Sequence, residues 1–119
     1  MAAREVSIWP VLGRKTVNEG SEQSFTVRFL SARALSAPTT ARWRLKSISS
    51  GGIVKDWTAI AAPSSEETVS VSGAYNTIRA GLDEEQYEFV VQSDYDDATI
   101  LQSASYLYTV KNISAIDDS

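Results

Sequence analysis

The sequence predicts an all-β fold, an immunoglobulin-like or fibronectin-III-like sandwich of two sheets with about seven strands and no disulfide. Apolar and polar residues alternate with a period of two along most of the chain. Turn-forming residues separate the alternating segments, and no long segment repeats with the helical period. This combination is typical of a β-sandwich. From the 119 residues we expect one β-sandwich domain over residues 1–119, with residues 1–5 and 114–119 as flexible or partner-ordered arms.

The clearest alternation places Phe25, Val27 and Phe29 on one face of a strand and Thr26 and Arg28 on the other. The same rule predicts four further inward-facing sets: Ala41, Trp43 and Leu45; Val69 and Val71; Tyr87, Phe89 and Val91; and Ala104, Tyr106, Tyr108 and Val110. We also expect a first strand over residues 6–12, a tight connection with a positive φ at Gly20 over residues 16–21, a loop over residues 33–38, a hairpin turn at residues 49–52 and a last strand over residues 99–113. Residues 73–81 are predicted to form either a short helical turn or a crossing connection.

Two aromatic residues make the sandwich more specific. Trp43 is expected to face the core from the third strand, and Tyr87 lies near the start of the sixth. In immunoglobulin-like sandwiches a tyrosine at that place closes a corner by bonding to backbone upstream. We therefore expect Tyr87 to form such a corner.

Charge is distributed unevenly along the chain. Residues 1–46 hold eight basic and three acidic side chains, a net charge of +5, whereas residues 47–119 have a net charge of −9. Complementary charges can lie on neighbouring strands of one domain, or a polar molecule can dock on its own copies or on a partner. The basic residues of the third strand face Glu88 and Gln92 of the sixth in such a sandwich, which favours the first interpretation for that part.

The residue types present argue against catalysis. The sequence has no histidine and no cysteine, which removes imidazole bases, thiolate nucleophiles and ordinary zinc sites. Asp94, Asp96 and Asp97 either gather a calcium ion or, as we expect, form a solvated turn. The carboxylates Glu66, Glu67, Asp83, Glu84, Glu85 and Glu88 show no pattern of a glycosidase pair and are expected at turns and strand edges. We therefore predict no enzyme activity, no cofactor and no metal.

Candidate contact residues are found in three places. Trp9 and Val11 make the first strand apolar on both faces, which indicates either an interface or a switch between sheets at Pro10. A basic stripe of Arg42, Arg44 and Lys46 and the terminal residues Ile113 and Ile116 complete the candidate set. No aromatic residue is expected on the face of the basic stripe, and the sequence pI is about 4.7, so we expect no nucleic-acid partner. No apolar run has the length of a membrane span, so we expect no membrane partner.

Several short motifs follow one another between residues 24 and 113. They are Ala41-Arg42-Trp43-Arg44-Leu45, Asp56-Trp57-Thr58, Val69-Ser70-Val71, Asn76-Thr77-Ile78, Tyr87-Glu88-Phe89-Val90-Val91, Ser93-Asp94-Tyr95 and Tyr108-Thr109-Val110-Lys111-Asn112-Ile113. In this order they resemble small immunoglobulin-like structural proteins of tailed bacteriophages.

The resemblance implies a non-enzymatic phage virion protein, first of all a multicopy capsid decoration or cement protein that bridges capsid subunits. It implies as partners the major capsid protein or other virion proteins, together with copies of the chain itself. It also implies a location in the virion after assembly in the host bacterial cytoplasm. A tail or head–tail connector accessory protein is the alternative within this class, and a carbohydrate- or host-surface-binding module using Trp57, Tyr75 and Tyr95 is the alternative outside it.

Overall fold

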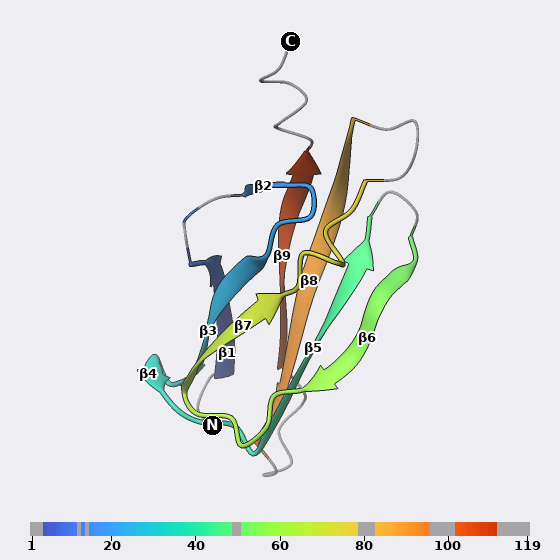
Figure 1. Cartoon of the computed structure of the whole chain (residues 1–119). Coiled ribbons are helices and arrows are strands. Elements are labelled where there is room, and N and C mark those ends of the chain that lie inside the picture. The colour runs from blue at the N-terminus through green and yellow to red at the C-terminus, as the bar shows by residue number, and fades with distance from the viewer. Residues whose placement is uncertain are drawn as a thin grey trace.

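The structure is a computed structural model that describes residues 4–11, 13, 15–48, 51–78, 83–95 and 102–111. These residues form nine β-strands in two sheets and no helix, which confirms the predicted all-β sandwich (Figure 1). The four-stranded sheet contains β1 (Arg4–Pro10), β3 (Gln23–Ser31), β4 (Ala34–Leu35) and β7 (Glu66–Val71). The five-stranded sheet contains β2 (Thr16–Asn18), β5 (Thr40–Ser47), β6 (Ile53–Ala59), β8 (Glu84–Asp94) and β9 (Gln102–Lys111).

The chain passes repeatedly between the two sheets. In the four-stranded sheet, β3 pairs with β1 on one side and with β7 and β4 on the other, always antiparallel. The strand order in the five-stranded sheet is β2-β9-β8-β5-β6, and β2 runs parallel to β9. The connection from β7 to β8 therefore crosses between the sheets. It begins with a turn at residues 73–75, where the N–H of Tyr75 donates to Ser72 O at 3.0 Å and that of Asn76 to Gly73 O at 3.1 Å, so it combines a single turn with the crossing. Residues 79–81 of the predicted segment lie outside the described part.

The core lies between the sheets and consists of the residues that alternation marks as inward. Phe25, Val27 and Phe29 are fully buried, and Trp43 is 8% exposed. The ring of Phe25 stacks on that of Phe89 across the core, with centroids 4.3 Å apart. Burying each such side chain stabilises the fold by about 1.5–3 kcal/mol, so the aromatic contacts between the sheets fix how the sheets face each other.

The predicted tyrosine corner is present. The Tyr87 hydroxyl donates a hydrogen bond of 2.6 Å to the backbone oxygen of Thr77, ten residues upstream. Beside it, the Tyr108 hydroxyl donates to Oδ1 of the fully buried Asn76, also at 2.6 Å. The Asn76 amide in turn donates to the backbone oxygen of Ser21 at 2.8 Å. These bonds attach the β7–β8 connection to one end of the sandwich.

Two short strands add to the expected seven. The predicted connection over residues 16–21 contains β2, and the predicted loop over residues 33–38 contains β4, while Gly20 has the expected positive φ of 80°. The first strand begins at Arg4, so Arg4 and Glu5 belong to β1 and not to an arm. Residues 114–119, the other predicted arm, lie outside the described residues.

Candidate interaction surface

The outward face of the five-stranded sheet carries a cluster of two arginines and a tryptophan, here called the arginine–tryptophan cluster: Arg42 and Arg44 of β5 and Trp57 of β6. Alternation in β5 turns Trp43 into the core and both arginines outward. In β6 the register shifts between the partners of Trp43 and Leu45, as it does at a β-bulge. Trp57 lies in this irregular stretch, which brings its ring over the outward face.

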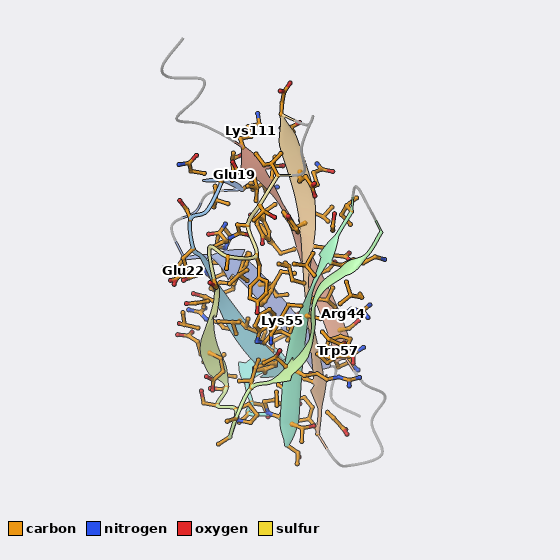
Figure 2. The ribbon with its side chains drawn as sticks, turned by 45° about the vertical axis from the view of Figure 1, so that its right-hand side comes forward. Glu19, Glu22, Arg44, Lys55, Trp57 and Lys111 are labelled. Carbon is orange, nitrogen blue, oxygen red and sulfur yellow. The ribbon has the colours of Figure 1, made fainter. Side chains whose placement is uncertain are left out.

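Both guanidinium groups lie against the same indole ring. The Cζ atom of Arg42 is 4.3 Å from the centroid of the Trp57 ring, and that of Arg44 is 4.7 Å from it. Figure 2 shows Arg44 and Trp57 next to each other, with Lys55 of β6 nearby. A cation–π contact at an exposed place stabilises by about 0.5–1 kcal/mol, enough to hold the side chains in place without neutralising them.

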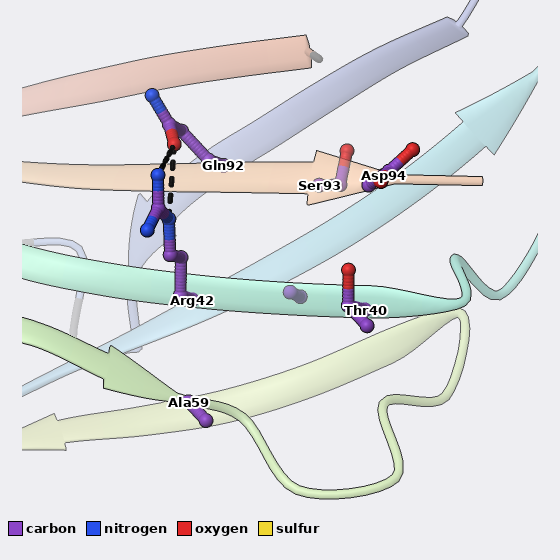
Figure 3. Close-up of a pocket in the computed structure, with 7 residues that line it drawn as sticks. Thr40, Arg42, Ala59, Gln92, Ser93 and Asp94 are labelled. Atoms are coloured by element: carbon purple, nitrogen blue, oxygen red, sulfur yellow. Dashed lines mark hydrogen bonds between the residues drawn. The ribbon is translucent and has the colours of Figure 1, made fainter. Parts of the chain in front are cut away.

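Neither arginine has a carboxylate partner among the described residues. Nε and Nη2 of Arg42 donate to Oε1 of Gln92 at 3.0 and 2.7 Å, as the dashed lines in Figure 3 show. The Nε of Arg44 is buried and has no hydrogen-bond partner. Two full positive charges are thus held together by an amide and an aromatic ring, so the cluster remains able to receive an anionic group.

An open pocket of about 310 Å³ adjoins Arg42 between β5, β6 and β8 (Figure 3). It is lined by Thr40, Ala41, Arg42, Ala59, Gln92, Ser93 and Asp94. The hydroxyl of Ser93 is buried there without a hydrogen-bond partner. This volume lies at the lower limit of small-molecule binding sites.

Exposed apolar residues border the cluster. Ile53 and Val54 begin β6, Ile48 follows β5, and all three side chains are exposed. Leu107 of β9 is 51% exposed and lies opposite Glu88 in the register of the sheet. Tryptophan and arginine among apolar side chains are the composition found at the centre of protein interfaces.

Of the other predicted contact residues, the structure places Trp9 and Val11 away from this face. Trp9 belongs to the opposite sheet, where Cζ of Arg28 lies 4.8 Å from its ring centroid. Val11 is exposed just after β1, and the chain then enters the five-stranded sheet at β2, so it switches sheets after Pro10. Lys46 does lie on the face of the cluster, opposite Glu88. Ile113 and Ile116 lie outside the described residues.

The expectation that no aromatic residue shares the face of the basic stripe is wrong. Trp57 comes from the neighbouring strand, and its position depends on the irregular register of β6. Sequence reasoning missed it because alternation assigns faces within one strand and does not show where a bulge places a residue against the next strand. Residues 53–59 contain no glycine or proline, so nothing in the sequence of β6 indicated the register shift.

Four of the six carboxylates considered for catalysis have structural partners. Glu66 pairs with Arg28, and Glu84 pairs with Lys111 at 3.4 Å. Glu67 accepts a hydrogen bond from the backbone N–H of Ser64, and the buried Glu85 accepts one from the Ser47 hydroxyl.

The described residues contain neither a cluster of metal ligands nor a membrane-spanning helix. Within the described ranges, no three acidic, histidine or cysteine side chains gather as metal ligands, and Asp96 and Asp97 lie outside those ranges. Nor do the described residues include a helix with the length and hydropathy that crossing a membrane demands.

The three aromatic residues considered for carbohydrate binding do not form one platform. Trp57 lies under two guanidinium groups. Tyr75 is half-buried against the core in the β7–β8 connection. Tyr95 follows β8 at the other end of the sandwich, where its hydroxyl donates to the backbone oxygen of Ser36 at 2.8 Å.

Comparison with known proteins gives similarity at the level of the fold. No family model matches the sequence, and a search of curated proteins finds no significant match. Three solved structures of a β-glucosidase from Listeria innocua are similar: complexes with glucose (TM-score 0.51, 15% identity), with laminaribiose in a mutant enzyme (0.50, 16%) and with isofagomine (0.50, 16%). Each match covers 92% of this chain but only 16% of the glucosidase chain. The chain therefore shares its backbone arrangement with a small part of these enzymes.

Proposed function

We propose that the chain is a non-enzymatic structural protein of a bacteriophage particle, present in many copies as a capsid decoration or cement protein that bridges neighbouring subunits. The observation that carries this proposal is the arginine–tryptophan cluster with its apolar border on the outward face of the five-stranded sheet. A rigid sheet that presents arginine, tryptophan and exposed aliphatic side chains suits a protein contact. The phage setting rests on the resemblance of the motif order between residues 24 and 113.

The chemistry of the site supports binding over catalysis. The sequence lacks histidine and cysteine, and Glu66, Glu84 and Glu85 each bond to a partner within the fold. What remains available is a cationic, partly aromatic surface, which can hold a partner but has no activated nucleophile. In a particle, repetition of a weak contact over many copies supplies the strength that a single contact lacks.

Add-back to capsids tests the proposal. Phage particles that lack this protein are incubated with purified chain, and the bound chain and the temperature of capsid disruption are measured. We expect saturable binding and a higher disruption temperature. Capsids that neither bind the chain nor gain stability contradict the proposal.

A matched pair of tryptophan variants tests the surface. Trp57 and Trp9 are both half-buried, both carry an arginine against the ring, and they lie on opposite sheets. We expect Trp57→Ala to weaken binding to capsids about tenfold or more, in line with the loss of an interface tryptophan, and Trp9→Ala to bind as the wild type. Loss of binding in Trp9→Ala alone assigns the contact to the other sheet and contradicts this choice of surface.

The alternative place within the particle is the tail or the head–tail connector. Quantitative mass spectrometry of separated heads and tails distinguishes the two, because a decoration protein fractionates with heads in a number close to that of the capsid subunits. A low, fixed copy number in the tail fraction selects the accessory role instead.

A further inference from the structure

The face that carries the arginine–tryptophan cluster has an excess of positive charge. Arg42 and Arg44 are joined there by Lys46 in β5 and Lys55 in β6. Among the described residues three acids lie close: Glu88 opposite Lys46, Asp56, and Asp94, which lines the pocket beside Arg42. The Asp56 carboxylate accepts a hydrogen bond from the backbone N–H of Trp57 at 2.8 Å. Within the described ranges, the bonds and ring contacts of the two central arginines are to the neutral groups of Gln92 and Trp57.

One end of the sandwich has the opposite charge. Glu19 follows β2, and Asp83 and Glu84 stand at the start of β8; all three side chains are exposed and are here called the acidic end. Among the described residues Lys111, at the end of β9, pairs with Glu84 there. The acidic end therefore keeps an excess of negative charge after its internal pair is counted.

A single copy cannot bring the two surfaces together. In Figure 2, Glu19 and Lys111 lie at the upper end, whereas Arg44 and Trp57 lie lower, on other strands of the same five-stranded sheet. The strand register agrees, because Glu84 pairs with Lys111 at one end of β8 and Arg42 pairs with Gln92 near its other end. Among the described residues, ion pairs within one copy join Arg28 to Glu66 and Lys111 to Glu84, and none involves Arg42 or Arg44.

We propose that the acidic end of one copy docks on the arginine–tryptophan cluster of a second copy. Carboxylates of the incoming copy pair with the forked guanidinium groups. Arg42 then donates to a carboxylate of that copy in place of the neutral Gln92, so its acceptor is charged. The two surfaces differ, so the contact is head-to-side, and each copy offers both surfaces at once. Repetition of such a contact builds rings or open chains. The inference rests on the proposed function, in which it provides the contact between neighbouring copies on the particle.

Association of the purified full-length chain tests this inference. Sedimentation velocity over a concentration series is expected to show reversible association beyond pairs. Because opposite charges at an exposed contact are screened, raising the salt from about 50 to about 500 mM is expected to weaken association about tenfold or more. A chain that stays monomeric at all concentrations in low salt overturns the inference.

Two neutral variants locate the surfaces. Arg42→Gln with Arg44→Gln removes the cluster's charge, and Glu19→Gln with Asp83→Asn weakens the acidic end. Each variant alone is expected to associate about tenfold less tightly. An equimolar mixture has one intact cluster and one intact acidic end per pair, so we expect it to form pairs and stop there.

Matched controls keep the test specific. Lys15→Gln with Arg33→Gln also removes two positive charges, but from exposed positions outside the cluster. This variant is expected to associate as the wild type. Circular dichroism must show the same melting for each variant. Association that survives loss of the cluster, or that is lost equally in the control, overturns the inference, as does a mixture that forms no pairs.

The outcome separates this inference from the function on which it rests. A chain that binds capsids but does not associate with itself removes the head-to-side contact and leaves the decoration role intact. A chain that associates through the cluster but does not bind phage particles supports the head-to-side contact and contradicts the decoration role.

Discussion

Asn76 holds separate parts of the chain together at one end of the sandwich. Its side chain accepts from the Tyr108 hydroxyl and donates to the Ser21 backbone, while its own backbone oxygen accepts from the N–H of Gly20 at 2.8 Å. Because the residue is fully buried, leaving any one of these groups without a hydrogen bond would lower the free energy of unfolding by about 1–3 kcal/mol. Asn76 therefore joins the β2–β3 turn to the β7–β8 connection, together with the hydrogen bond of 3.0 Å that the N–H of Ile78 donates to the Glu19 carboxylate.

Gly73 is the residue that allows these two segments to approach. A Cβ atom there would lie 2.0 Å from the backbone oxygen of Gly20. We expect Gly73→Ala to destabilise the protein by about 3 kcal/mol or more. The added Cβ would clash with a backbone atom, which cannot move aside by a change of rotamer. Urea unfolding measures this.

The control for that variant is Gly51→Ala. Gly51 has a φ of 73° and no atom within 4 Å of an added Cβ, so the cost there is conformational, about 1 kcal/mol. Equal losses of stability in the two variants would show that the close approach at Gly73 is not a constraint.

Because the Tyr108 hydroxyl is buried, we expect the protein to lose stability in alkali. Burial, and to a smaller extent the neighbouring Tyr87, raises the pKa of its hydroxyl well above 10. An unfolded tyrosine releases its proton near pH 10, whereas folded Tyr108 keeps it, so unfolding above this pH releases a proton and the free energy of unfolding falls. One such group contributes a slope of about 1.4 kcal/mol per pH unit.

Unfolding midpoints between pH 8 and pH 12 for the wild type and Tyr108→Phe check this expectation. The variant is expected to be less stable at neutral pH, because Oδ1 of Asn76 loses its donor, but to show a shallower fall in alkali. Parallel curves for the two proteins would assign the alkaline slope to other groups.

At the scale of the element, the β3–β4 turn is the clearest case of backbone strain. Its two central residues, Ala32 and Arg33, have φ angles of 51° and 68°, and neither is a glycine. Positive φ at both positions is the pattern of the tight hairpin turn in which Asn-Gly is preferred. We expect Ala32→Asn with Arg33→Gly to stabilise the protein by about 1 kcal/mol, measured as a higher thermal midpoint.

A single substitution elsewhere in the same element gives the comparison. Leu35→Thr replaces an exposed strand residue that has a standard backbone conformation, so it is expected to leave the midpoint nearly unchanged. A midpoint that falls in the Asn-Gly variant would show that Ala32 and Arg33 fit the turn better than the preferred pair.

Long strands were predictable and short ones were not. The burial of β3, β5, β7 and β8 follows alternation residue by residue, because each of these strands has one face in the core. β2 has three residues and β4 has two, too few for a period to show. β4 also depends on the turn at Ala32 and Arg33, which carries no glycine signal.

Considered as a whole, the molecule shows which parts of the site depend on tertiary structure. The positions of Trp43 in the core and Tyr87 at its corner followed from their places in the strand order. The arginine–tryptophan cluster did not, because it joins β5 to β6 through an irregular register. The uneven charge was predicted to be satisfied either within the domain or between molecules. The ion pair of Arg28 and Glu66 represents the first, while Arg42 and Arg44, which have no carboxylate partner among the described residues, leave the second for experiment.

The parallel pairing of β2 with β9 has a mechanical consequence. Arg4, where β1 begins, and Lys111, where β9 ends, lie at opposite ends of the sandwich (Figure 1). Tension applied between these points pulls β2 and β9 along their length in opposite directions. The hydrogen bonds between them lie across that direction, so they share the load and break together rather than one after another. A chain built in this way resists stretching between its two ends.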